Sequence, residues 1–164
     1  MLPTIQKILY ATDLSKNSQP AFGYAASLAK QYHADLLVLH AIEPVNPNTY
    51  SHISGIMGEA EWVNVQVDFE SRMVDDLGSK LREFCRHLQT GIDEIRLKDE
   101  HLLVRKGVSV DIIIEVAAEK DADIIVMGTH GYGMLKDALM GGTARRIVRR
   151  SEIPVMVVRS MEED

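Results

Sequence analysis

The chain has 164 residues, the length of one domain, and carries 24 acidic against 18 basic side chains, a net charge of −6. Its hydrophobic share of 46% excludes disorder of the whole chain. The acidic balance argues against a general nucleic-acid or anionic-membrane binder, because both ligands need a basic surface. A single cysteine, Cys85, excludes an intrachain disulfide framework and a cysteine-rich zinc site. We expect one domain over residues 1–164, cytoplasmic, with neither a signal peptide nor a stretch long enough to cross a membrane.

The first half of the chain alternates short apolar runs with helical patterns. Residues 8–12 and 36–42 are continuous apolar runs, typical of strands that are buried on both faces of a parallel sheet. Between them, cap candidates at Asn17 and Ser18 and the early Pro20 predict the start of a helix. Its expected inner face is Ala21, Ala25, Leu28, Ala29 and Tyr32.

A Pro-, Asn-, Ser- and Gly-containing stretch from residue 44 to about 59 predicts a long loop, and a long helix is expected from about 60 to 88. Residues 102–104 suggest a third strand that ends near Gly107.

The remaining elements repeat the alternation. We expect a helix over 110–120, a strand over 123–127, a short helix over 143–150 and a last strand over 155–158. The short helix should turn Ala144, Ile147, Val148 and Ser151 inward. Alternating strands and helices predict an α/β fold, a parallel sheet with helices on both faces.

The segment from Gly128 to Thr143 is the richest candidate site. In open parallel sheets, ligands bind at the carboxyl ends of the strands, where the strand order reverses. A strand, a glycine loop and a helix N-terminus form the geometry of a phosphate cradle. The segment has no Gly-Lys-Ser/Thr triplet and no dinucleotide fingerprint, which excludes those two phosphate motifs. Turn-forming glycines remain the alternative interpretation.

Local charge also favours an anion. Residues 129–150 hold five basic side chains and one acidic one. Arg149 and Arg150 suit a helix C-terminus, whereas Arg145 and Arg146 oppose the dipole at the N-terminus unless an anion lies near. Solvated surface is an equal alternative for the latter pair.

The glycine spacing is more specific. Gly128, two residues, Gly131, nine residues and Gly141 together resemble the nucleotide-binding signature of the universal stress protein family. Residues 8–15 are similar to the family's first strand and loop, and 123–131 and 154–158 to its fourth and fifth strands. The resemblance covers essentially the whole length. It implies a Rossmann-like fold with a five-stranded parallel sheet in the order 3-2-1-4-5, and often a homodimer.

The resemblance also implies a set of site residues for ATP. Asp13 would accept hydrogen bonds from the ribose. The base and ribose side would be Ala11, Thr12, Asp13 and Ala41; Met127, Gly128, His130 and Gly131 would border the ribose and phosphates; Gly141, Gly142, Thr143 and Ala144 would meet the phosphates through backbone N–H groups.

One position departs from the signature. The family has serine or threonine where this chain has Gly142, so the backbone N–H remains and the hydroxyl is lost. A hydrogen bond to a charged group contributes about 1.5–3 kcal/mol, so we expect weaker ATP binding. Thr143 is the candidate for a replacement hydroxyl.

Three functions follow. The leading one is an ATP-binding regulatory stress-response protein that acts through nucleotide-dependent interactions. No catalytic arrangement is evident, so fast turnover is not expected. The alternatives are a weak ATPase or self-phosphorylating enzyme, supported by Thr129 or Thr143, and a dimeric interaction module without nucleotide, supported by Gly142.

Two partners are expected besides the nucleotide. No all-protein metal cage is visible, so Mg²⁺ or Mn²⁺ would be held through phosphate oxygens. A homodimer should form through residues 155–158, because an apolar strand at the edge of a sheet is a template for pairing. The family resemblance points to the same edge.

Overall fold

The computed structural model describes residues 1–44, 51, 55–56, 58–89, 95, 97–129 and 140–159. Its strands are β1 (Lys7–Ala11), β2 (Asp35–Ile42), β3 (Leu102–Lys106), β4 (Ile124–Gly128) and β5 (Val155–Val158). Its helices are α1 (Gln19–Tyr32), α3 (Glu59–Gln89), α4 (Ser109–Glu119) and α5 (Gly142–Arg150), with 3₁₀ turns at Lys16–Ser18 and Asp99–His101. The expected elements of the α/β fold are therefore present.

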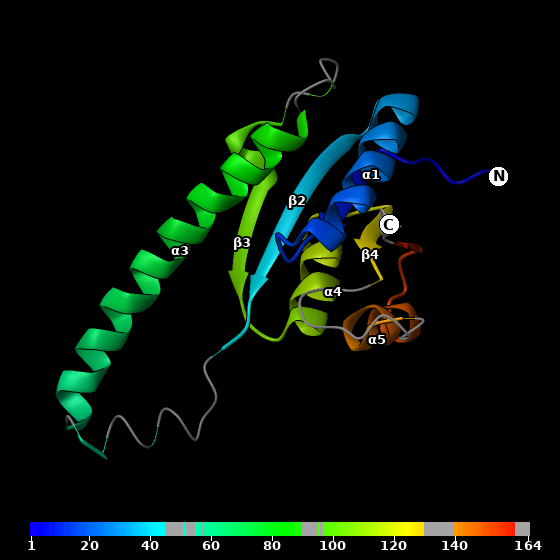
Figure 1. Ribbon diagram of the computed structural model, residues 1–164. Helices are drawn as coiled ribbons and strands as arrows, with labels where there is room; N and C mark the ends of the chain where they lie inside the picture. The colour runs from blue at the N-terminus through cyan, green and yellow to red at the C-terminus, as the bar shows by residue number, and fades with distance from the viewer. Residues whose placement is uncertain are drawn as a thin grey trace, which may run out of the picture.

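The five strands form one parallel sheet in the order β3-β2-β1-β4-β5, which confirms the expected topology. Figure 1 shows β3 and β2 of this sheet side by side. The order reverses at β1, since β1 pairs with β2 on one side and with β4 on the other. The carboxyl ends of β1 and β4 therefore flank the crevice where ligands of open parallel sheets bind.

Helices cover both faces of the sheet. On one face, Ile113 of α4 and Ile147 of α5 pack against Leu9 and Ile125. On the other face, Phe22 of α1 and Leu81 of α3 belong to a second core cluster that includes Tyr10 and Val38 of the sheet. Because both faces are buried, the strands read as unbroken apolar runs instead of alternating ones.

Helix α1 begins where the sequence predicts, after Ser18 and with Pro20 in its first turn. Its expected inner face is correct at Ala21, Ala25 and Ala29, with Leu28 half-buried, but wrong at Tyr32, which is 49% exposed. The last turn of α1, which includes Tyr32, extends past the start of the sheet (Figure 1). Phe22 is buried on the sheet instead.

Helix α5 shows a similar correction. Ala144 and Ile147 are buried and Ser151 is half-buried, whereas Val148, which was expected on the inner face, is 46% exposed. A helix of nine residues meets the sheet along a narrow stripe, and Val148 lies about 100° around the helix from Ile147.

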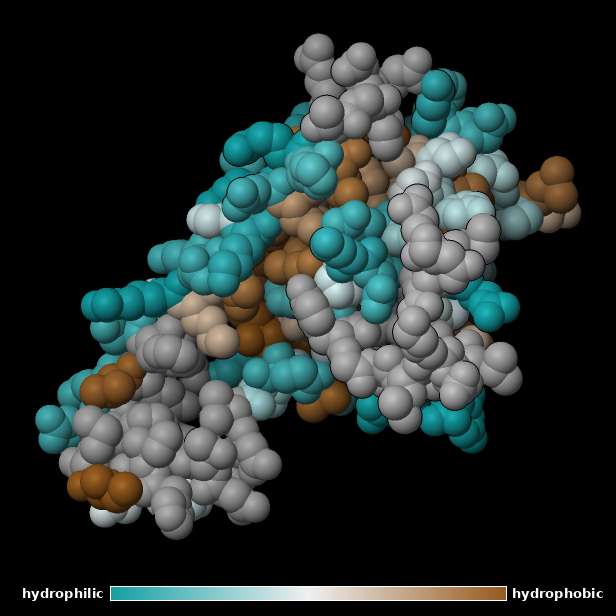
Figure 2. Space-filling model, in the orientation of Figure 1, coloured by the Kyte–Doolittle hydropathy of each residue, from teal (hydrophilic) through white to brown (hydrophobic). Residues whose placement is uncertain are grey.

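Helix α3 packs along only part of its length. Leu81 and Cys85 in its C-terminal half are buried, while Val63, Val67 and Val74 in its N-terminal half are exposed. Figure 1 shows this N-terminal half extending away from the sheet. In Figure 2, hydrophilic residues follow the outward side of α3 and hydrophobic ones gather between α3 and the sheet.

The segment before α3 was expected to be a long loop. Its described positions Ser51, Gly55 and Ile56 are helical, so the loop is not wholly irregular.

Cys85 is a packing residue of α3. Burial raises the pKa of its thiol to about 12, so the group stays protonated and unreactive at neutral pH. Among the described residues, no helix is long and apolar enough to cross a membrane.

Candidate functional site

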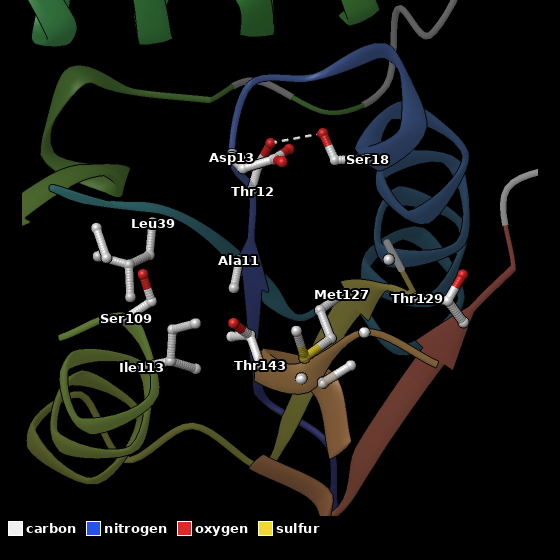
Figure 3. A pocket seen from close by; sticks show the side chains of 15 residues that line it. Ala11, Thr12, Asp13, Ser18, Leu39, Ser109, Ile113, Met127, Thr129 and Thr143 are labelled. Carbon is white, nitrogen blue, oxygen red and sulfur yellow. Dashed lines mark hydrogen bonds between the residues drawn. The ribbon is translucent and has the colours of Figure 1, made fainter. Parts of the chain in front are cut away.

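A cavity of about 290 Å³ opens at the carboxyl ends of β1, β2 and β4, between the N-termini of α4 and α5 (Figure 3). The cavity therefore lies in the crevice beside β1, where the order of the strands reverses. The lining residues are Ala11, Thr12, Asp13, Ser18, Leu39, Ala41, Ser109, Ile113, Met127, Gly128, Thr129, Gly141, Gly142, Thr143 and Ala144.

Every predicted site residue that the structure describes lines this cavity. The two others, His130 and Gly131, lie outside the described residues. Sequence reasoning missed four lining residues: Ser18, Leu39, Ser109 and Ile113. A fifth, Thr129, was named only as support for the weak-ATPase alternative. A signal existed for Leu39, since residues two apart on a strand share a face and Ala41 was already assigned.

The loop after β1 is held by its own polar side chains. Asp13 Oδ1 accepts hydrogen bonds from the backbone N–H of Ser15 at 3.0 Å and from the Ser15 hydroxyl at 2.5 Å. Thr12 Oγ1 accepts from the Leu14 N–H at 3.0 Å and lies 2.8 Å from Ser18 Oγ. Leu14 takes a positive φ of 65°, an uncommon conformation that these bonds stabilise. The loop therefore presents Asp13 in a fixed position.

His40 ties this loop to the neighbouring strand. Its Nδ1 lies 2.9 Å from the Thr12 carbonyl oxygen, which can only accept, so Nδ1 carries the proton. The Thr12 N–H in turn donates to the Leu39 carbonyl at 2.9 Å. Both backbone groups of Thr12, its N–H and its carbonyl, are thus hydrogen-bonded to residues of β2.

The two helix N-termini at the cavity differ in one respect. At α4, the Glu43 carboxylate accepts from both the backbone N–H of Ser109 at 2.8 Å and its hydroxyl at 2.5 Å. The Glu43 carboxylate therefore already lies at the positive end of the α4 helix dipole.

At α5, Gly141 is the N-cap and supplies no side-chain cap. The first helical bond runs from the Arg145 N–H to the Gly141 carbonyl at 3.0 Å. The N–H groups of Gly142, Thr143 and Ala144 have no acceptor among the described residues. This end can receive an anion, because its N–H groups and the helix dipole both favour negative charge.

Thr129 lines the cavity and is hydrogen-bonded to β5 and to Gly141, the N-cap of α5. Its N–H donates to the Val158 carbonyl of β5 at 3.0 Å, and its own carbonyl accepts from the Gly141 N–H at 2.7 Å. Its side chain is 4% exposed, and within the described part of the chain its hydroxyl has no hydrogen-bond partner. Within the described residues, the backbone of Thr129 is hydrogen-bonded on both sides, to β5 and to Gly141.

The profile of the universal stress protein family matches residues 4–159 of this sequence. The chain belongs to the universal stress protein family. It is 25% identical to universal stress protein MJ0577 of Methanocaldococcus jannaschii, over 94% of each chain. It is 31% identical to universal stress protein A homolog 1 of Coxiella burnetii, over 92% of this chain and 94% of that one.

Solved structures have the same fold. That of MJ0577 superposes with a TM-score of 0.67 at 21% identity, covering 98% of this chain and all of the other. A universal stress protein in complex with cAMP superposes with a TM-score of 0.60 at 21% identity, covering 97% of this chain and all of the other. At this level of identity the likeness establishes the shared fold.

Proposed function

We propose that this universal stress protein is a regulatory protein that binds an adenine nucleotide, ATP foremost, in the cavity at the carboxyl end of its sheet. One observation supports the proposal: site residues that are far apart in the sequence line the same cavity. The family signature assigns these residues, and they come from β1, β2, β4 and α5. A universal stress protein of the same fold has been solved in complex with cAMP, itself an adenine nucleotide.

The lining suggests how the nucleotide lies. Leu39, Ala41 and Ile113 give one end of the cavity an apolar surface for the base. Asp13 stands beside this end and would accept hydrogen bonds from the ribose hydroxyls. The phosphates would lie at the N-terminus of α5, since α4 already has the Glu43 carboxylate at its own N-terminus.

The same lining favours binding over turnover. Among the described lining residues, Asp13 alone is ionisable, and its Oδ1 is engaged by Ser15. A divalent ion would be held mainly by phosphate oxygens. Binding would then act through a change in the interactions of the protein.

Calorimetric titration of ATP and CTP into the purified chain tests the proposal. ATP should bind more tightly, because the small apolar end fits a purine and offers no partners matched to cytosine. Equal affinities for the two nucleotides, or no ATP binding, would contradict it. Retention of ATP, ADP or AMP through purification, read by mass spectrometry, would separate this function from that of a module without nucleotide.

Asp13→Asn refines the test. The amide oxygen can still accept from Ser15 and preserve the loop, while the acceptor for the ribose is weakened. We expect roughly tenfold weaker ATP binding with an unchanged melting temperature. An unchanged dissociation constant would limit Asp13 to its turn with Ser15.

We further propose that two copies pair through β5. It is the last strand of the sheet, and Val155 and Val157 are half-buried rather than covered. An exposed apolar edge is a template for a second strand.

A further inference from the structure

The inner face of helix α3 remains exposed where the helix extends away from the sheet (Figure 1). Leu81 and Cys85, in the C-terminal half of α3, are buried in the core. Val63, Val67 and Val74 point within about 40° of the same direction around the helix, because each residue turns it by 100°. These three valines are nevertheless 45%, 64% and 41% exposed. They form an apolar stripe that continues the buried face of α3 without being buried itself.

The half of α3 that carries the apolar stripe also carries most of the net charge of the chain. Residues 59–76 hold six acidic side chains and one basic one, a net charge of −5, against −6 for all 164 residues. Residues 77–89 hold three basic side chains and one acidic one. The charge therefore changes sign near Leu77, the first half-buried residue of the helix. Acidic character is confined to the half whose stripe is exposed.

Three of the acidic residues form a ridge along the helix. Glu61, Asp68 and Asp75 are seven positions apart, close to two helical turns, so they lie above one another about a third of a turn from the apolar stripe. Asp68 forms an exposed ion pair with Arg72 at 2.9 Å, whereas Glu61 and Asp75 have no ion pair within the described part of the chain. Exposed pairs of this kind are weak, so the acidic ridge stays available to a partner.

This charge determines which partner fits the stripe. A second copy of the chain would bring its own acidic half against the first, because the C-terminal half of its α3 is already packed on its sheet. Like charges oppose that contact, and they also oppose contact with an anionic membrane surface. A helix with an apolar face and flanking lysine or arginine side chains complements both features of α3.

We propose that the N-terminal half of α3 is a docking surface for a basic amphipathic helix of a partner protein. The apolar stripe would pack against the apolar face of the partner, and the acidic ridge would attract and orient its basic side chains. The inference goes beyond the proposed function and does not depend on it, since no described residue of α3 lines the nucleotide cavity.

The probe is a fluorescently labelled amphipathic peptide of leucine and lysine, about 18 residues or five helical turns long, titrated with the full chain. Wild type should bind it with a micromolar dissociation constant. Val63→Ser/Val67→Ser/Val74→Ser should bind it roughly tenfold more weakly, because the apolar contact is lost. The matched control is Val148→Ser, which changes a 46% exposed valine of α5 and should bind like wild type.

A second variant tests the acidic ridge by changing its carboxylates to amides, through Glu61→Gln, Asp68→Asn and Asp75→Asn. It should weaken peptide binding roughly three- to tenfold at low salt and less at high salt, mainly through slower association. The control removes as many exposed carboxylates from other parts of the chain, through Glu100→Gln, Glu115→Gln and Glu152→Gln. This control keeps the net charge equal to that of the ridge variant and should bind the peptide more tightly.

Several results would overturn the proposal. Wild-type affinity in the valine variant, or equal binding of a peptide with glutamate in place of lysine, would exclude docking on this surface. Equal losses in the ridge variant and its control would assign binding to general acidity. Because the three valines are exposed, their variant should melt within about 2 °C of wild type, and a lower melting temperature would indicate packing inside the chain.

Two further measurements test the other occupants of the stripe. Sedimentation of wild type and of the valine variant should give the same oligomeric state, and dissociation of the variant would assign the stripe to a second copy. Neither protein should bind phosphatidylcholine vesicles. Vesicle binding that the valine substitutions abolish would assign the stripe to a lipid surface instead of a protein helix.

Discussion

Gly142 is the first residue of α5, where the family signature has serine or threonine. The backbone there has no positive φ, and among the described residues the nearest atom to a Cβ added at Gly142 is Arg146 Nη2 at 4.0 Å. A serine therefore fits without strain. A lack of space therefore does not explain why this position has no hydroxyl.

Gly142→Ser should tighten ATP binding by up to about 1.5–3 kcal/mol, because it adds a donor beside the proposed phosphate site and keeps the backbone N–H. The measurement is a calorimetric titration at one salt and Mg²⁺ concentration. Gly142→Ala is the matched control, since it adds the same Cβ without a hydroxyl and should bind ATP like wild type.

Two results would count against this prediction. Equal gains in the Ser and Ala variants would assign the effect to helix stabilisation. No gain in Gly142→Ser, together with a large loss in Thr143→Ala, would show that Thr143 already supplies the missing hydroxyl.

The residue scale also shows the limit of sequence reasoning. The glycine signature located Gly128 and Gly141, because backbone approach to an anion leaves a pattern in spacing. It did not locate Ser18 or Ser109 as lining residues. Whether a hydroxyl is satisfied depends on which elements the fold brings beside it, and no local pattern encodes that.

At the scale of elements, the N-terminus of α4 depends on a residue from another element. Glu43 follows β2 directly, and its carboxylate accepts from the N–H and hydroxyl of Ser109, 66 positions along the chain. The register of β2 against β3 places these residues together, since Ile42 pairs with Lys106. Sequence patterns within α4 give no sign of this contact.

Glu43→Ala should lower the free energy of unfolding by about 1 kcal/mol, because it removes the acceptor at the α4 N-terminus. Urea denaturation provides the measurement. Glu43→Gln retains the acceptor oxygen without the charge, and its loss should be smaller. Equal stability of Glu43→Ala and wild type would mean that water replaces the carboxylate at no cost.

Element boundaries were predicted well where a strong apolar pattern met a buried face, as in β1 and β2. The errors at Tyr32 and Val148 share one cause. Helical periodicity reports which side of a helix is apolar, but not how far the neighbouring sheet extends beneath it. Burial at a helix end is therefore decided by tertiary structure.

At the scale of the whole molecule, the order β3-β2-β1-β4-β5 leaves β5 at one end of the sheet. The Ile125 N–H donates to the Pro154 carbonyl and the Thr129 N–H to the Val158 carbonyl. Backbone groups alternate sides along a strand, so those of Val155 and Val157 face away from β4. They are the groups available to a second copy.

This geometry decides which substitution tests the dimer. Val157→Pro removes an N–H that faces the open edge and leaves the bonds between β4 and β5 in place, so the fold should survive. Sedimentation should show a dimeric wild type and a largely monomeric Val157→Pro variant. Val157→Ala shortens the same side chain, keeps the N–H and should remain dimeric. A monomeric wild type would remove the hypothesis, and equal dissociation of the Pro and Ala variants would assign the contact to side-chain packing instead of strand pairing.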